Sequence, residues 1–124
     1  MKNRETWDDR YGLLNHPYLH YGVVALTSGP FNAGVDDGAA VILIDTGGAA
    51  FTVNLPPANL NPGKAFFVKK INAGAGAVKL QPQAGDTIET AVSLSTITAQ
   101  FDCLQIVSDG GTGWWVIGEA GPSF

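Results

Sequence analysis

Short apolar segments separated by turn residues recur from about Gly38 onward, and this pattern constrains the fold more than any other feature. Turns rich in Gly, Pro, Asn and Asp follow one another about every 8–12 residues, and the segments between them are rich in β-branched and aromatic residues. No helical periodicity of useful length interrupts them. A chain of 124 residues is long enough for one core and too short for two domains. We therefore expect a single all-β domain.

Eight segments carry the strand pattern, and the clearest alternates Phe51, Val53 and Leu55 with polar Thr52 and Asn54. Strands joined by such short turns favour an antiparallel β-sandwich of jelly-roll type. The predicted strands are residues 21–26, 40–45, 50–55, 64–72, 77–81, 87–89, 99–107 and 114–118.

Several of these segments are apolar on both faces. Successive strand residues point to opposite sides, so if Trp114 enters the core then Trp115 points away from it. The segment 40–45 (AVILID) is apolar on both sides, and residues 99–107 place Leu104 and Ile106 opposite Phe101 and Cys103. A lone two-layer fold leaves one polar face on each strand. Two-sided strands therefore predict a third layer, which the N-terminal segment, another subunit or a host surface could supply.

Residues 1–30 differ in character from the rest. After a charged start, the stretch YGLLNHPYLHYGVVALTSGP runs without Asp, Glu, Lys or Arg, and Gly and Pro interrupt both helical and strand periodicity. We interpret 1–30 as an N-terminal arm that attaches to a capsid or clasps a subunit, ending in a short strand, and 31–124 as the β-sandwich domain. The alternative is an arm that packs on its own domain.

Charge and cysteine content exclude several classes. The net charge is −4 and the basic residues are scattered, which argues against nucleic-acid binding. Cys103 is the only cysteine, so no intramolecular disulfide can form, and its apolar surroundings favour a small buried side chain over a nucleophile. No signal peptide or membrane span is evident, which predicts folding in a reducing cytoplasm and no membrane partner.

The sequence offers little chemistry. His16 and His20 are four residues apart, but Pro17 lies between them and no third metal ligand is near, so we expect no metal site. The acidic residues in DDG, GD and SDG are turn residues that cap backbone amides rather than a paired catalytic set. GAGAG lacks the Lys-Ser/Thr of a phosphate-binding loop, and no serine has a nucleophile-elbow motif. We expect neither an enzyme nor a cofactor.

Residues from about Phe51 to Gly118 resemble a β-sandwich module of tail fibres, tailspikes and capsid-decorating proteins of tailed bacteriophages. The motifs that carry the resemblance, in order, are TVNLPPA, NPGKAFFVKKI, AVKLQPQAGDTI and VSDGGTGWWVIG. The family pattern has a strand ending in Leu-Pro, a Pro-Gly-Lys/Arg turn, a Gly-Asp-Thr-Ile turn and a Trp-containing last strand. Trp114 matches the core aromatic of that pattern, whereas Trp115 is particular to this chain. Such modules are typically homotrimers, which agrees with strands that are apolar on both faces.

The resemblance implies a structural virion protein. A compact trimerising head with a short uncharged arm fits a capsid cement (decoration) protein that sits on the outer capsid surface and bridges subunits of the major capsid protein. The alternative is the receptor- or glycan-binding tip of a tail fibre or tailspike, with a host-surface glycan as partner. The capsid-contact candidates are Trp7, Tyr11, Leu13, Leu14, His16, Tyr18, Leu19, His20 and Tyr21. The core or trimer-interface candidates are Phe51, Phe66, Phe67, Phe101, Leu104, Ile106, Trp114 and Trp115.

Overall fold

The computed structural model describes residues 20–89 and 96–121, and this part of the chain is built from β-strands and turns with one short 3₁₀ turn, η2 (Ala58–Leu60). The predicted all-β class is therefore confirmed. The strands are β1 (Val23–Leu26), β2 (Phe31–Asn32), β3 (Val41–Ile44), β4 (Phe51–Asn54), β5 (Ala65–Lys70), β6 (Val78–Gln81), β7 (Thr87–Ile88), β8 (Thr96–Ile97), β9 (Cys103–Ser108) and β10 (Gly113–Ala120).

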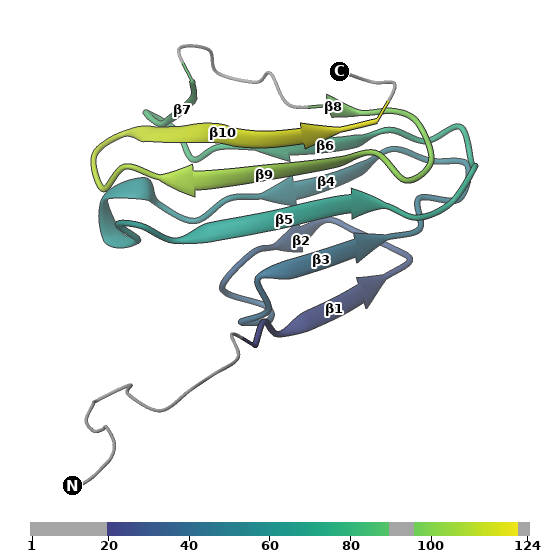
Figure 1. Cartoon of the computed structure of the whole chain (residues 1–124), viewed down its shortest axis with the longest axis horizontal. Helices are drawn as coiled ribbons and strands as arrows, with labels where there is room; N and C mark the ends of the chain where they lie inside the picture. The colour runs from purple at the N-terminus through teal and green to yellow at the C-terminus, as the bar shows by residue number, and fades with distance from the viewer. Residues whose placement is uncertain (1–19, 90–95, 122–124) are drawn as a thin grey trace, which may run out of the picture.

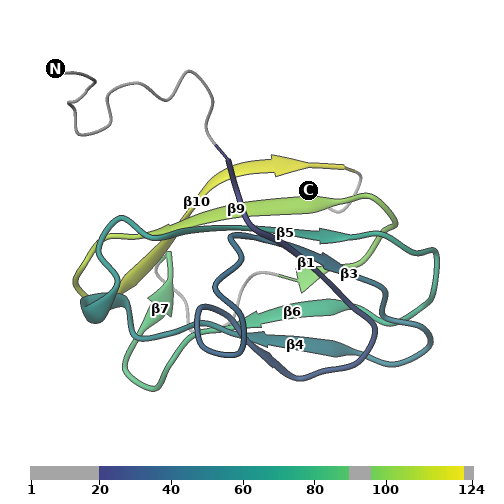
Figure 2. The ribbon, with the colours of Figure 1, turned by 90° about the horizontal axis from the view of Figure 1, so that it is seen from below.

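The strands form two sheets that lie one over the other (Figures 1 and 2). One sheet has six strands in the order β1-β3-β5-β9-β10-β7, and the other has four in the order β2-β4-β6-β8. From β1 to β8 the chain crosses from one sheet to the other at every step. The result is solenoid-like, because the first six strands make three coils that advance along both sheets.

The prediction of antiparallel pairing is wrong for most of this fold. Five of the eight strand pairs in the described residues are parallel, among them β1 with β3, β3 with β5 and β4 with β6. The antiparallel pairs are β5 with β9, β9 with β10, and β6 with β8. Parallel neighbours need a crossover between them. Here the crossover is a strand of the facing sheet, so most of the predicted turns are corners between the two sheets.

The corners of successive coils are stacked on one another. The Thr46 hydroxyl donates to the carbonyl oxygen of Gly76, and the Thr46 backbone N–H donates to the Asn72 side-chain oxygen at 3.0 Å. The backbones approach so closely that a Cβ at Gly74 would lie 2.0 Å from the Gly47 carbonyl oxygen. Buried Lys70 donates through Nζ to the carbonyl oxygens of Asn72 and Gly74, at 2.8 and 2.6 Å, and so holds the second corner from inside. These contacts fix the alignment of the neighbouring coils.

The core lies between the two sheets. Trp114 is completely buried, and its ring packs against Phe66 with the ring centroids 5.7 Å apart. The predicted core role of Trp114 is confirmed. The other buried apolar side chains of this cluster come from both sheets and the loops between them: Phe31, Ala33, Ile42, Ile44, Phe51, Val53, Leu55, Ala58, Val68, Val78, Leu80, Ile88, Ile97, Leu104 and Ile106.

Each of the eight predicted segments contains a strand, but two strands were missed. These are the two-residue β2 and β8, which are too short to show periodicity. The segment 99–107 begins as a strand only at Cys103. Phe101 lies before it in a turn, with a φ of 70° and a side chain that is 59% exposed, so its predicted place on the strand is wrong and, of the two roles predicted for it, the core is excluded. Val23–Leu26, at the end of the predicted arm, pairs with β3 as an edge strand.

Candidate assembly surface

The outer face of the six-stranded sheet is apolar. In β3, β5 and β9, the residues that alternate with the buried core positions are half-buried, and most of them are hydrophobic. Trp115 and Ile117 continue this face on β10, and Val23 begins it on β1. We call the following set the outer apolar face: Val23, Ala25, Val41, Leu43, Ala65, Phe67, Lys69, Cys103, Gln105, Val107, Trp115 and Ile117.

Strand register arranges this face in rows. One row runs Val23, Val41, Phe67 and Gln105 across four neighbouring strands, and a second runs Ala65, Val107 and Trp115. Cross-strand neighbours in such rows are in side-chain contact. The face is therefore one continuous surface rather than scattered apolar side chains.

Tyr21 lies over this surface from the N-terminal side. Its ring packs against Phe67, two strands away, with the centroids 5.1 Å apart and the planes at 58°. Even so, Tyr21 is 48% exposed and Val23 is 60% exposed. Within the described residues, the chain covers the centre of the face only in part and leaves both edges open.

The outer face of the four-stranded sheet is polar. The strand residues that alternate with its core positions are Asn32, Thr52, Asn54, Lys79, Gln81 and Thr96. Asn32, Asn54 and Gln81 are aligned by register, and the Asn54 Nδ2 donates to Asn32 Oδ1 at 3.0 Å. Asn32 is held in turn by Asp36, whose carboxylate accepts from the Asn32 backbone N–H at 2.8 Å. Side chains of this kind are satisfied by water and by each other.

Trp115 stands at the edge of the apolar face beside a tight turn. Its indole Nε1 donates to Asp109 Oδ2 at 2.9 Å, and Asp109 Oδ1 accepts from the backbone N–H groups of Gly111 and Gly113. These bonds, the one from Trp115 first, hold the pKa of the Asp109 carboxyl below its usual value. The indole ring itself is 39% exposed. The indole N–H of Trp115 is thus hydrogen-bonded within the chain, whereas much of its apolar surface is left uncovered.

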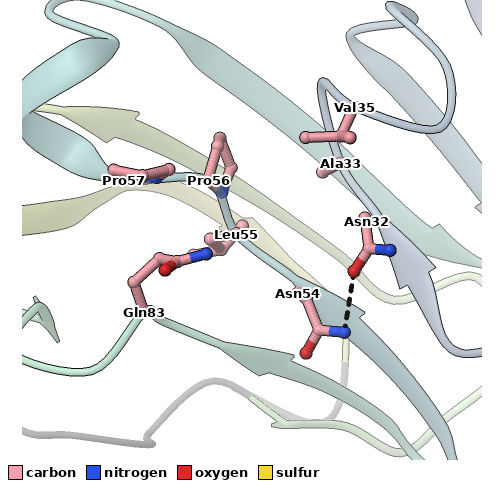
Figure 3. Close-up of a pocket in the computed structure, with 8 residues that line it drawn as sticks. All are labelled: Asn32, Ala33, Val35, Asn54, Leu55, Pro56, Pro57 and Gln83. Atoms are coloured by element: carbon pink, nitrogen blue, oxygen red, sulfur yellow. Dashed lines mark hydrogen bonds between the residues drawn. The ribbon is translucent and has the colours of Figure 1, made fainter.

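A small pocket lies on the polar side of the molecule (Figure 3). Its volume is about 250 Å³, and it is formed between the turn after β2 and the segment after β4. Asn32, Asn54 and Gln83 contribute carboxamides, whereas Val35 and Pro56 are among its apolar walls. A lining without charged side chains suits a neutral polar group.

The remaining candidates for chemistry are structural. Asp37 and Asp86 accept from the backbone N–H groups of Ala39 and Ala58, at 2.7 and 3.0 Å. The interpretation of the acidic residues as turn caps is confirmed for these and for Asp109. Cys103 is a free, half-buried thiol on the outer apolar face. Among residues 20–89 and 96–121, no group of three or more His, Cys, Asp or Glu side chains could hold a metal ion.

The structure separates the predicted core or interface residues from one another and describes two of the capsid-contact candidates. Phe51, Phe66, Leu104, Ile106 and Trp114 lie in the core between the sheets, which leaves Phe67 and Trp115 on the outer apolar face. Phe101 is close to that face, because the Nζ of Lys69 lies 5.8 Å from its ring centroid. Of the capsid-contact candidates, His20 and Tyr21 are exposed. The others lie outside the described residues: Trp7, Tyr11, Leu13, Leu14, His16, Tyr18 and Leu19.

Sequence reasoning missed several members of the outer apolar face. Val41 and Leu43 belong to a run recognised as apolar on both sides, yet no residue of that run was named as an interface candidate. Ile117 lies two residues after Trp115, so simple alternation places it on the same face, and the bulge between Val116 and Gly118 shifts the pairing of β10 with β9 only for the residues that follow it. The two-sided apolar pattern could have identified Val41 and Leu43, and alternation from Trp115 could have identified Ile117.

No protein-family model matches this chain, and no curated protein matches it significantly. No helix in the described part of the chain combines the length and apolar character needed to cross a membrane.

Proposed function

We propose that this chain is a structural virion protein without enzymatic activity: a capsid cement (decoration) protein that forms a homotrimer, each subunit a β-sandwich of the two facing sheets, on the outer capsid surface. The observation that carries the proposal is the outer apolar face of the six-stranded sheet. A contiguous apolar surface of this size on a small domain marks an interaction site. The resemblance of residues 51–118 to trimeric phage modules supports the same conclusion.

The energetics favour an interaction role for this face. Covering one exposed Trp or Phe side chain stabilises an assembly by roughly 2–3 kcal/mol at the usual coefficient per apolar area. Because several such side chains lie on one face, a single contact can remove all of them from water. The acidic turn residues, by contrast, are occupied with backbone amides.

The mechanism is mechanical. A cyclic trimer matches local three-fold or quasi-three-fold symmetry of an icosahedral shell. Three arms, one from each subunit, would contact the major capsid protein, and their attachment as a set would raise the effective affinity of individually weak contacts. The bridged capsid subunits would then resist the pressure of packaged DNA. Folding in the host cytoplasm precedes this attachment.

Capsid binding of an arm deletion tests the proposal. The full chain and a variant lacking residues 1–20 are each mixed with capsids that lack the protein, and the bound fraction is measured after sedimentation of the capsids. We expect the full chain to co-sediment and the deletion variant to stay in solution with its oligomeric state unchanged. Equal binding by both variants would refute the capsid role of the arm, and no binding by the full chain would refute the cement function.

The second candidate function is receptor or glycan binding at the tip of a tail appendage. The carboxamide-lined pocket favours it, because neutral hydrogen-bonding side chains beside apolar walls suit a sugar ring. The partly exposed indole of Trp115 is a second surface on which a sugar could stack. A glycan array separates the two candidates: specific glycan binding that Asn54→Ala abolishes would favour the appendage role.

A further inference from the structure

We propose that the partner of the outer apolar face is a second copy of this chain, so that this face, and not the polar face of the four-stranded sheet, forms the contact between subunits. The inference rests on the proposed homotrimer and assigns its interface. It concerns the surface alone and does not depend on a capsid.

The charge of the face favours another copy of itself. Lys69 is the one charged side chain among the strand residues that make up the face, as described above. An acidic or basic partner would find almost nothing to pair with, and a membrane surface would find no basic cluster. Three copies with this face turned toward a common axis bring apolar surfaces together with little like-charge repulsion. The core of an interface is typically depleted of charge in this way.

The size of the face is adequate for a stable contact. Five large apolar side chains on it or beside it are between 39% and 60% exposed: Tyr21, Val23, Phe101, Trp115 and Ile117. Large side chains of this kind bury about 150–250 Å² each, so these five leave roughly 500 Å² of surface open. Half-buried Val41, Leu43, Phe67 and Val107 bring the total toward the ~800 Å² that each partner contributes to a standard interface.

The distribution of these residues extends the contact across five of the six strands of the sheet. Val23 lies on edge strand β1, and Trp115 and Ile117 lie on β10, with three strands between them (Figure 1). Glutamate at either edge would therefore be buried in the contact of the assembled protein, while it would remain in water in the separated chain.

The test compares matched substitutions on and off the face. Val23→Glu and Ile117→Glu change residues that are 60% and 55% exposed, so neither should prevent folding of the subunit. Val35→Glu and Leu60→Glu are the controls, because the same or a similar apolar residue is 72% and 73% exposed there and lies off the face. The mass in solution is measured by light scattering over a concentration series, and circular dichroism checks that each variant is folded.

We expect the unaltered chain to have three times the mass of one subunit, and we expect each face variant to raise the concentration for half-dissociation about tenfold or more. The two control variants should dissociate like the unaltered chain. A monomeric unaltered chain, or an oligomer that the face variants leave intact, would overturn the proposal.

A deletion of residues 1–19 in the same assay distinguishes a second copy from the N-terminal arm as the partner of this face. An oligomer that survives the deletion supports contact between copies through the sheets. A deletion variant that becomes monomeric and binds a hydrophobic dye would overturn the proposal in favour of the arm as the cover. Failure of capsid binding alone would leave this result unchanged, because the assay contains no capsid.

Discussion

The two outer faces of this molecule differ sharply although the two sheets share one core. On β4, polar Thr52 and Asn54 alternate with buried Phe51 and Val53, as expected of a strand with one side in water. On β3, the outward residues are Val41 and Leu43, so the strand is apolar on both sides. Both strands satisfy the same core. The comparison teaches that core packing determines only the inward residues of each strand. The outward residues indicate whether water or another apolar surface lies against that face.

The difference extends to how each face is stabilised. The polar face has its own hydrogen bonds, such as that from Asn54 to Asn32. The apolar face has contacts such as Tyr21 over Phe67, which still leave much of the tyrosine ring in water. A face of the first kind is complete in the isolated chain. A face of the second kind gains free energy when another surface covers it.

The largest expected effect distinguishes the inward from the outward side of the sheet at two adjacent residues of β10. Trp114→Ala should lower the free energy of unfolding by about 3–5 kcal/mol, because it removes a large, fully buried side chain from the core. Trp115→Ala should cost the subunit much less and should instead weaken association. Urea denaturation and light scattering measure the two effects. Equal losses of unfolding free energy for both variants would contradict the assignment of inner and outer sides.

The next effect tests the contact between the stacked corners of successive coils. A Cβ at Gly76 would lie 2.0 Å from the backbone oxygen of Ala49, so Gly76→Ala must push the stacked corners apart. We expect a loss of about 1–3 kcal/mol in the free energy of unfolding. Gly48→Ala is the matched control, since a Cβ there meets nothing within 4 Å. If thermal denaturation shows both variants equally stable, the corners are not in contact as described.

A smaller effect sharpens the comparison on the polar face. Asn54→Ala removes the side-chain bond to Asn32 and should lower the free energy of unfolding by about 0.5–1.5 kcal/mol, with no change in oligomeric state. Thr52→Ala, on the same strand and face, controls for the truncation of an outward polar side chain. A change of oligomeric state in Asn54→Ala would show that the polar face also takes part in assembly.

The smallest effect concerns pH at the edge of the apolar face. Because the folded-state pKa of Asp109 is lowered, the stabilisation from its ionised form is complete above the ordinary pKa of an aspartate and is lost as the pH falls through the lowered value. Tryptophan fluorescence should therefore change only at a pH below the ordinary aspartate range, as the bond to Trp115 weakens. Both Asp109→Asn and Trp115→Phe should remove this transition. A transition that persists in either variant would belong to another group.

Much of the strand content could be predicted from the sequence because local patterns encode it. Alternation at residues 50–55 and the Gly- and Asp-rich turns placed most strands and turns correctly, and the core position of Trp114 was also predicted. Strand pairing could not be predicted in this way. A short turn looks the same in sequence whether it returns the chain to the same sheet or carries it to the facing one.

The candidate site was predictable in kind and not in detail. Apolar residues on both sides of a strand indicated a surface that needs cover, and Trp115 was assigned to it from its neighbour Trp114. The sequence could not decide which of Phe66 and Phe67 faces the core, because adjacent aromatic residues on one strand are equivalent until the core side of the strand is known. The register of the strand after Val116 could not be predicted either, because the bulge between Val116 and Gly118 depends on the pairing of β10 with β9.

The sequence by itself determined the all-β class, the positions of most strands and the presence of more apolar surface than one core needs, since these follow from residue type and period. The tertiary structure alone decided which side of each strand faces the core, how the coils stack, and that the excess apolar surface gathers on the six-stranded sheet. The physical reason is that period and composition are local properties of the chain. Burial and register depend on residues that are distant in sequence and become neighbours only when the two sheets close over one another.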